Sequence, residues 1–176
     1  MYHKDSNLAS YEGFLKTLKN EPESSDSLFE LMKSQKGWGS KTAALFVKYI
    51  YIIHKDDAFK TFRIWTDFSL NENELKLPVD VVITHIFKNS FLQEKKQSTF
   101  VGINKFISNL PSENRNVIIW DELWFWGFIT QKIENKKRVS NKFNENKFWC
   151  LPYIENDKEE IEKLAKEFLK LLKNKP

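Results

Sequence analysis

The sequence has little cysteine, glycine, proline or arginine, and it contains no long hydrophobic run. Its single cysteine, Cys150, excludes an intramolecular disulfide framework and a zinc or iron–sulfur site built from several cysteines. No apolar stretch reaches the roughly 18 residues of a membrane span, and the N-terminal residues do not resemble a signal peptide. These absences predict a soluble, cytoplasmic protein that does not enter a membrane.

The charges are nearly balanced, with 28 Lys and Arg against 24 Asp and Glu and a net charge of +4. Only three of the basic residues are arginines. This modest excess is compatible with binding to nucleic acid but does not require it. A length of 176 residues with 41% hydrophobic and 15% aromatic residues predicts one folded domain with a sizeable core.

Helical spacing of apolar residues predicts a single all-α domain without internal repeats, possessing one segment of irregular or β structure. The expected N-caps are Asp26 or Ser27, Ser40, Asp80, Ser98 or Thr99, and Asp157. Residues 113–131 are expected to form an aromatic helix, and residues 135–147 a charged loop. The predicted segments are 1–27 (with a short helix at 11–19), the two helices of 28–54, the irregular or β segment at 55–77, further helices in 78–150, and a C-terminal amphipathic helix in 151–176.

The stretch from Lys36 to Ala44 is the most informative part of the sequence. Two glycines separated by one residue allow a tight turn whose backbone N–H groups face outward. The helix that follows adds its own N–H groups and the positive end of its dipole, which suits a phosphate of a DNA backbone. An ordinary turn between packed helices is the alternative, and so short a pattern does not decide between them. The residues concerned are Gly37, Trp38, Gly39, Ser40 and Thr42.

Two residues near this turn carry reactive groups. Lys41 stands in the first turn of the predicted helix, where the dipole disfavours an ammonium ion, and an amine so placed can serve as a nucleophile. Asp80 follows Pro78 and Val79 at a predicted helix start, and its carboxylate can stabilise a sugar cation or move a proton. Taken singly, Lys41 is one of 25 lysines and Asp80 is a simple helix cap.

Taken together, Gly37-Trp38-Gly39-Ser40-Lys41-Thr42-Ala43 and Pro78-Val79-Asp80 resemble the helix-hairpin-helix DNA glycosylase superfamily, the group of endonuclease III and 8-oxoguanine glycosylase. The likeness continues through Thr84-His85-Ile86-Phe87 and through 98–127, and it covers roughly Leu28 to Cys150.

This resemblance implies removal of a damaged or modified base from double-stranded DNA, followed by abasic-site lyase chemistry. Lys41 would form the Schiff base and Asp80 would be the essential acid, while Gly37, Trp38, Gly39, Ser40 and Thr42 would hold a DNA phosphate. His85 and Trp124 would line or support the base pocket. With only Cys150 present, the family's iron–sulfur cluster has no ligand set, so no cofactor and no metal are expected. In a bacterium the protein would be associated with the nucleoid.

The sequence departs from the family pattern in its spacing. Lys41 and Asp80 are 39 positions apart, about twice the family's usual separation, so residues 55–77 look like an insertion. Another alignment puts Ile83 at the position of the acid; we prefer Asp80, which is a natural cap. Only 36 residues precede Gly37, so a homodimer, a partner or the insertion would complete the cleft, or the cleft is open.

Two non-catalytic interpretations stay open: a helix-hairpin-helix module that only binds DNA, and an interaction protein in which the hairpin is a turn. The patterns of two further sets of side chains predict structural roles and not contact with DNA. Aromatic residues at helical spacing favour core packing over base stacking, and a basic stretch favours a solvated loop over phosphate binding. They are Trp120, Trp124, Phe125, Trp126 and Phe128 in the first set, and Lys132, Lys136, Lys137, Arg138, Lys142 and Lys147 in the second.

Overall fold

The computed structural model describes residues 12–13, 16, 24–64, 70–92, 94, 97–140, 142–147 and 157–173. These residues are mostly helical, as predicted, and the sheet that they contain has two strands. Their contacts group into two compact units: unit 1 comprises Met1–Pro78 and Pro111–Val117, and unit 2 comprises Val79–Leu110 and Ile118–Pro176. The single-domain organisation stays a prediction. Cys150 and most of the predicted helix at 11–19 lie outside the described residues.

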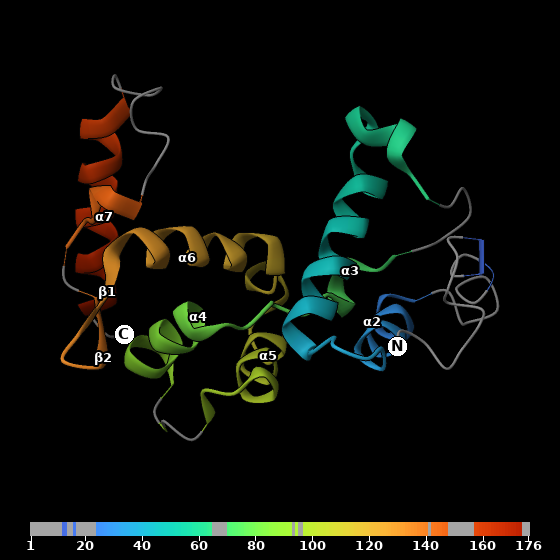
Figure 1. Ribbon diagram of the computed structural model, residues 1–176, viewed down its shortest axis with the longest axis horizontal. Coiled ribbons are helices and arrows are strands. Elements are labelled where there is room, and N and C mark those ends of the chain that lie inside the picture. The colour runs from blue at the N-terminus through green and yellow to red at the C-terminus, as the bar shows by residue number, and fades with distance from the viewer. Residues whose placement is uncertain are drawn as a thin grey trace. The chain divides into compact units, whose positions relative to one another are not determined.

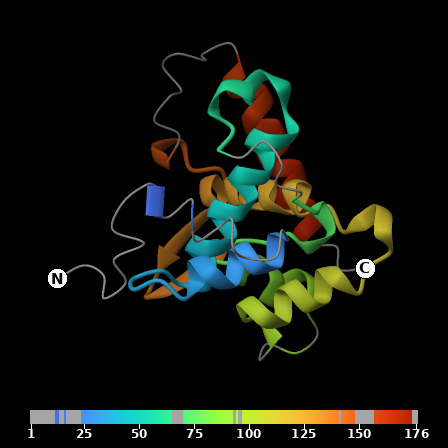
Figure 2. The ribbon, with the colours of Figure 1, turned by 90° about the vertical axis from the view of Figure 1, so that its right-hand side faces the viewer.

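Unit 1 is built on two helices, α2 (Ser25–Lys33) and α3 (Ser40–Lys55), which pack against each other (Figures 1 and 2). The N-cap of α2 is Ser24, whose side chain accepts a hydrogen bond from Ser27 N, so the caps predicted at Asp26 or Ser27 are wrong. The N-cap of α3 is Gly39, so Ser40 is the first helical residue and not the predicted cap. The buried apolar residues of the two helices are Leu28, Phe29, Met32, Ala43, Ala44, Val47, Ile50 and Tyr51.

The segment predicted to be irregular or β has two different parts. Asp57–Phe62 forms a 3-10 helix, η2, whose Phe59 and Phe62 side chains are exposed. A short strand at residues 61–65, which the sequence allows within this β or irregular segment, is therefore wrong over 61–64, while residue 65 lies outside the described residues. In contrast, Leu75 and Leu77 are buried. The second part of this segment thus belongs to the core of unit 1.

Polar contacts fix this second part, which includes the short 3-10 helix η3 (Glu72–Glu74), onto α2 and α3. Ser25 Oγ donates to Asn71 O and accepts from Asn71 N, both at 3.0 Å. Tyr51 Oη donates to Glu72 Oε2 at 2.7 Å. Burial and this carboxylate together raise the pKa of Tyr51 to about 12. The buried Ser25 thereby fixes the backbone of the segment at Asn71, and the buried Tyr51 fixes the carboxylate of Glu72.

Unit 2 contains α4 (Val81–Ile86), which continues into a π-helical turn, η4 (Phe87–Phe91), and then α5 (Phe100–Ser108). Asp80 caps α4 and Thr99 caps α5, as predicted. The aromatic helix α6 (Val117–Thr130) begins later than predicted, because Ser112–Asn114 forms a separate 3-10 helix, η6. The amphipathic helix α7 (Lys158–Lys173) ends the described chain. Among the described residues, no helix combines the length and the apolar character needed to cross a membrane.

A cluster of four aromatic rings joins η4, α5 and α6. The centroids of Phe87, Phe91, Phe106 and Trp120 lie between 5.1 and 6.3 Å apart, in tilted and edge-to-face arrangements. Such pairs contribute about 0.5–1.5 kcal/mol each beyond the area that they bury. The structure places Trp120 in this cluster, in agreement with the core-packing role predicted for it. Figure 1 shows the result, with α6 lying along α4 and α5.

Gly127 allows α6 to approach α4 closely. A Cβ atom at this position would lie 2.6 Å from Val82 Cγ1 and 2.7 Å from Ile86 Cδ1, both on buried side chains of α4. One turn further on, the fully buried Gln131 donates from Nε2 to Val82 O at 3.1 Å and accepts from Arg138 Nη1 at 3.4 Å. Gly127 provides the space for the two helices to meet, and the side-chain amide of Gln131 forms hydrogen bonds across this contact.

The charged loop predicted at 135–147 is wrong over its first part, which belongs to a β-hairpin. Strands β1 (Gln131–Glu134) and β2 (Lys137–Ser140) pair antiparallel. Asn135 and Lys136 connect them with φ angles of 48° and 61°, which fits the two-residue turn of a twisted hairpin.

The basic stretch is likewise partly built into the fold. After β2, Glu145–Lys147 forms the 3-10 helix η7. Lys147 Nζ donates to Phe128 O at 3.0 Å and to Gln131 O, so this ammonium neutralises the carbonyl end of α6. Burial and the charge of Arg138 lower the pKa of Lys147. Lys147 and Arg138 are both half-buried, and not the solvated loop residues expected.

Replacing Gly127 by alanine should destabilise unit 2. The new methyl group meets two buried side chains, and such overpacking costs about 1–3 kcal/mol, even though alanine has the better helix propensity by about 1 kcal/mol. Urea and thermal unfolding measure the effect. Glu122→Ala, at an exposed position of the same helix, is the control, with an expected change below about 0.5 kcal/mol. Equal stability of the two variants would contradict the close contact of α4 with α6.

Candidate functional site

The predicted hairpin between α2 and α3 depends on a left-handed residue. Gly37 has a φ of +88°, which side chains rarely adopt, while a Cβ atom there would meet nothing within 4 Å. Glycine is therefore required at position 37 because of the backbone conformation, and not because a side chain would lack space. Trp38 N donates to Gln35 O at 3.1 Å and closes the turn. Gly39 then leads into α3 in an extended conformation.

The N-terminus of α3 has the geometry of an anion-binding helix end. Its N-cap, Gly39, supplies no side-chain hydrogen bond, and the first main-chain bond of the helix runs from Ala43 N to Gly39 O at 3.0 Å. The amides that precede Ala43 come before this first bond and point beyond the helix end. Lys41 and Thr42 are exposed and Ser40 is half-exposed. The structure thus gathers the predicted phosphate-binding residues on one turn, with Lys41 among them.

Trp38 is half-buried, and its ring meets the edge of Phe46 on α3 at a centroid distance of 5.5 Å and an angle of 79°. A tryptophan between two glycines can contact either DNA or a neighbouring helix, and the structure shows the contact with the helix. The contact braces the hairpin against its own helix.

Asp80 is held by three N–H groups. Its Oδ1 accepts from Val82 N at 2.8 Å and from Ile83 N at 3.0 Å, and its Oδ2 accepts from Trp124 Nε1 at 2.9 Å. Trp124 is 40% exposed and stacks on Phe128, with the rings 8° from parallel. Two predicted site residues are thereby in contact, which the sequence did not indicate. Ile83, the position that the other alignment gives to the acid, is fully buried, and the choice of Asp80 stays a prediction.

His85 lies one turn beyond Asp80 on α4, half-buried among basic groups. Asn89 Nδ2 donates to His85 O at 2.6 Å and lies 3.3 Å from His85 Nδ1. An amide that also donates to Nδ1 places the ring proton of neutral His85 on Nε2. Burial, Arg138 and Lys88 lower the pKa of His85. The residue belongs with the basic side chains of β2, a grouping that sequence distance concealed.

The predicted residues are distributed over both units. Gly37, Trp38, Gly39, Ser40, Lys41 and Thr42 lie in unit 1, and Asp80, His85 and Trp124 lie in unit 2. A meeting of Lys41 with Asp80 stays a prediction. No group of three or more His, Cys, Asp or Glu side chains suited to a metal ion occurs in the described part of the chain.

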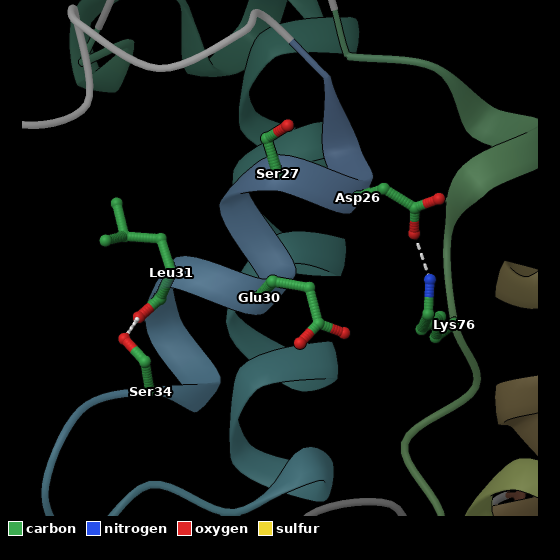
Figure 3. Close-up of a pocket in the computed structure, with 6 residues that line it drawn as sticks. All are labelled: Asp26, Ser27, Glu30, Leu31, Ser34 and Lys76. Carbon is green, nitrogen blue, oxygen red and sulfur yellow. Dashed lines mark hydrogen bonds and ion pairs between the residues drawn. The ribbon is translucent and has the colours of Figure 1, made fainter.

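A hollow of about 620 Å³ opens on α2 of unit 1, and Asp26 and Lys76, which form an ion pair, are among its lining residues (Figure 3). Its other lining side chains are Ser27, Glu30, Leu31 and Ser34. Asp26 and Lys76 neutralise each other, and Ser34 Oγ donates to Leu31 O at 2.7 Å. None of the residues predicted to bind DNA lines this hollow.

Comparison with protein-family models, curated proteins and solved structures gives no match. The likeness to helix-hairpin-helix glycosylases therefore depends on the sequence motifs alone.

The hydrogen bond from Trp124 to Asp80 should stabilise unit 2 measurably. Trp124→Phe keeps a ring but removes the donor, and we expect a loss of about 1 kcal/mol, below the roughly 1.5–3 kcal/mol of a buried charged bond because the indole is partly exposed. Asp80→Ala should cost about 0.5–2 kcal/mol through loss of the cap. A double-mutant cycle by urea unfolding isolates the pair. A coupling energy near zero would contradict a contributing bond.

His54 and His85 should both make the fold less stable in mild acid. Burial and Arg63 lower the pKa of His54, and burial, Arg138 and Lys88 lower that of His85. Because each folded-state pKa lies below the usual value of about 6.5, the unfolded chain binds more protons between the two values. The free energy of unfolding therefore decreases as the pH falls from 6.5 through the folded-state pKa, and it has no such slope above 6.5.

NMR titration of the imidazole Hε1 signals and urea unfolding at several pH values measure this effect. His85→Gln should remove its share of the slope and leave that of His54. A titration of either histidine above 6.5 would contradict the burial that the structure gives them.

Proposed function

We propose that the protein is a helix-hairpin-helix DNA glycosylase with abasic-site lyase activity, in which Lys41 is the nucleophile and Asp80 the assisting carboxylate. The observation that carries the proposal is the hairpin itself: a left-handed glycine, an uncapped helix N-terminus and an exposed lysine in the first helical turn. A non-specific phosphate grip requires the first two features, and amine chemistry requires the third.

The proposed reaction uses an amine and a sugar. Nζ of Lys41, in its neutral form, attacks C1′ while the bond from C1′ to the base breaks, and the base leaves with the electron pair and takes up a proton. The C1′–O4′ bond then breaks, O4′ keeps its electrons and takes up a proton lost from Nζ, and a protonated imine forms between Nζ and C1′. Loss of a proton from C2′ then expels the 3′ phosphate, which leaves with the electrons of its C3′–O bond. Positive charge at C1′ during the first step is what a carboxylate would stabilise.

Asp80 is suited to this role by its fixed orientation. Both carboxylate oxygens accept hydrogen bonds from groups of α4 and α6. A side chain held in this way needs no rearrangement when charge develops beside it, which is the condition for electrostatic stabilisation. Trp124, which holds Oδ2 and is partly exposed, is suited to stack on a displaced base.

Borohydride trapping on abasic-site DNA tests the proposal. The wild-type protein should give a covalent adduct, because borohydride reduces the imine to a stable amine. Lys41→Gln should give none. Lys36→Gln removes the same charge from an exposed position just before the hairpin and should still be trapped. No adduct with the wild type, or equal trapping by the Lys41 variant, would refute the lyase step.

Asp80→Asn separates the chemical role of this residue from its structural one. Asparagine caps helices as well as aspartate does, so α4 should be retained. The charge is lost, and base release should slow by about 10²-fold or more if the carboxylate stabilises the sugar cation. Equal rates for this variant and the wild type would restrict Asp80 to helix capping.

The second candidate function is a helix-hairpin-helix module that binds DNA without cleaving it. The same uncapped N-terminus of α3 favours it. It predicts duplex binding that weakens with salt, no adduct, and no strand scission. Absence of duplex binding at low salt would exclude both candidates and leave the hairpin as a turn.

A further inference from the structure

Unit 2 contains a cavity of about 370 Å³ that takes no part in the proposed reaction of Lys41 and Asp80, although His85, expected near the base pocket, is among its lining residues. Three segments distant in sequence line it: α4 with the π-helical turn η4, strand β2, and the end of α7. Its volume is at the lower end of the range for small-molecule sites. The lining residues are His85, Ile86, Asn89, Ser90, Arg138, Val139, Ser140, Leu169, Leu172 and Lys173.

The charge on the cavity wall is positive. Arg138 and Lys173 line it, and none of its lining residues is acidic. Arg138 is half-buried and its hydrogen-bond partner is the neutral amide of Gln131, so its charge is not cancelled there. The basic groups are close enough to affect their neighbours: Arg138 and Lys88 both disfavour protonation of His85. An anion in this cavity would relieve that repulsion.

The cavity also offers a hydroxyl that has no assigned use. Ser140 Oγ is buried and has no hydrogen-bond partner among the described residues. Ser140 and Arg138 are two residues apart on β2 and therefore point to the same side of the strand. In contrast, Ser90 Oγ is engaged with Leu172 O at 3.2 Å, and the amide of Asn89 with His85. A buried hydroxyl is costly unless it finds an acceptor, so a rotation of the Ser140 side chain toward an anion in the cavity would complete its bonding.

The rest of the wall is apolar. Ile86 and Leu169 are buried, and Val139 and Leu172 are half-buried. Leu169 and Leu172 come from the apolar stripe of α7. Such a surface favours a ligand that carries an organic body next to its charged group.

We propose that this cavity binds a small organic phosphate monoester, with its phosphate held by Arg138, Lys173 and Ser140 and its apolar body against Ile86, Leu169 and Leu172. A phosphate has three terminal oxygens and nearly two negative charges, which match two cations and a hydroxyl donor better than a carboxylate does. The apolar wall distinguishes this site from the flat basic surface that grips a DNA backbone. The inference is independent of the proposed glycosylase, because none of these residues takes part in that reaction.

Titration of the full chain with phenyl phosphate tests the proposal. Calorimetry measures the binding, and the NMR Hε1 signals of the histidines report on their protonation. We expect saturable binding that raises the pKa of His85 and leaves that of His54, which lies in unit 1, unchanged. Inorganic phosphate should bind more weakly, and phenol should not perturb His85. Absence of saturable binding up to about 10 mM, a concentration that detects affinities weaker than 1 mM, would overturn the proposal.

Substitutions on α7 provide a matched pair. Lys173→Gln should weaken phenyl phosphate binding about tenfold, the effect of losing one charged hydrogen bond. Lys163→Gln removes the same charge from an exposed position of the same helix outside the cavity and should bind as the wild type does. Ser140→Ala should also weaken binding. Equal effects of the two lysine variants would reduce the interaction to general charge attraction and overturn the proposal.

A titration with duplex DNA tests whether the cavity binds the phosphates of a nucleic-acid backbone and not a small phosphate monoester. If a short duplex shifts the His85 signal while phenyl phosphate does not, the cavity contacts a phosphodiester backbone and the proposal is wrong. Trapping through Lys41 is measured separately, so loss of that activity leaves the cavity result intact, and the reverse also holds.

Discussion

The absence of a side chain at Gly127 is the constraint on which unit 2 depends. It lets α6 come within contact of Val82 and Ile86 on α4. Trp124 and Gln131, about one turn to either side on the same face of the chain, then reach Asp80 and the carbonyl of Val82. A larger residue would separate the helices and break both bonds at once. The orientation of the candidate acid is therefore set by packing some distance from its own carboxylate.

The short helix α4 presents different chemistry at its two ends. Asp80 accepts from the amides at its N-terminus, and His85, Arg138 and Lys88 interact near its C-terminal half, where the chain continues into the wider π-helical turn. An acid at the beginning of a helix and cations towards its end also agree with the helix dipole. Each charged group thus has a structural reason to be present, which is why only measurements that separate stability from activity can assign it a chemical role.

Local signals made most of the helices and the caps of α4 and α5 predictable from sequence, but not the caps of α2 and α3. Asp80 and Thr99 were identified because a side-chain acceptor precedes a helical pattern, and Gly37 because a tight turn needs a left-handed residue. The β-hairpin was missed because its turn, Asn135-Lys136, has positive φ angles without a glycine, and its strands carry many charges. The contact between Trp124 and Asp80, 44 residues apart, and the cavity, drawn from three segments, arise only from tertiary packing.

The net charge of +4 says little about where positive charge is available, because the ion-pair or hydrogen-bond partner of each basic side chain determines whether its charge is neutralised. Arg63 donates to Asp57 at 2.7 Å, so its charge is matched by a carboxylate. Arg138 is likewise half-buried, yet its partner is the amide of Gln131, which satisfies one N–H and leaves the charge intact. Its field lowers the pKa of both His85 and Lys147. A buried glutamine in place of an acid, made possible by the space at Gly127, is thus what keeps this part of unit 2 positively charged.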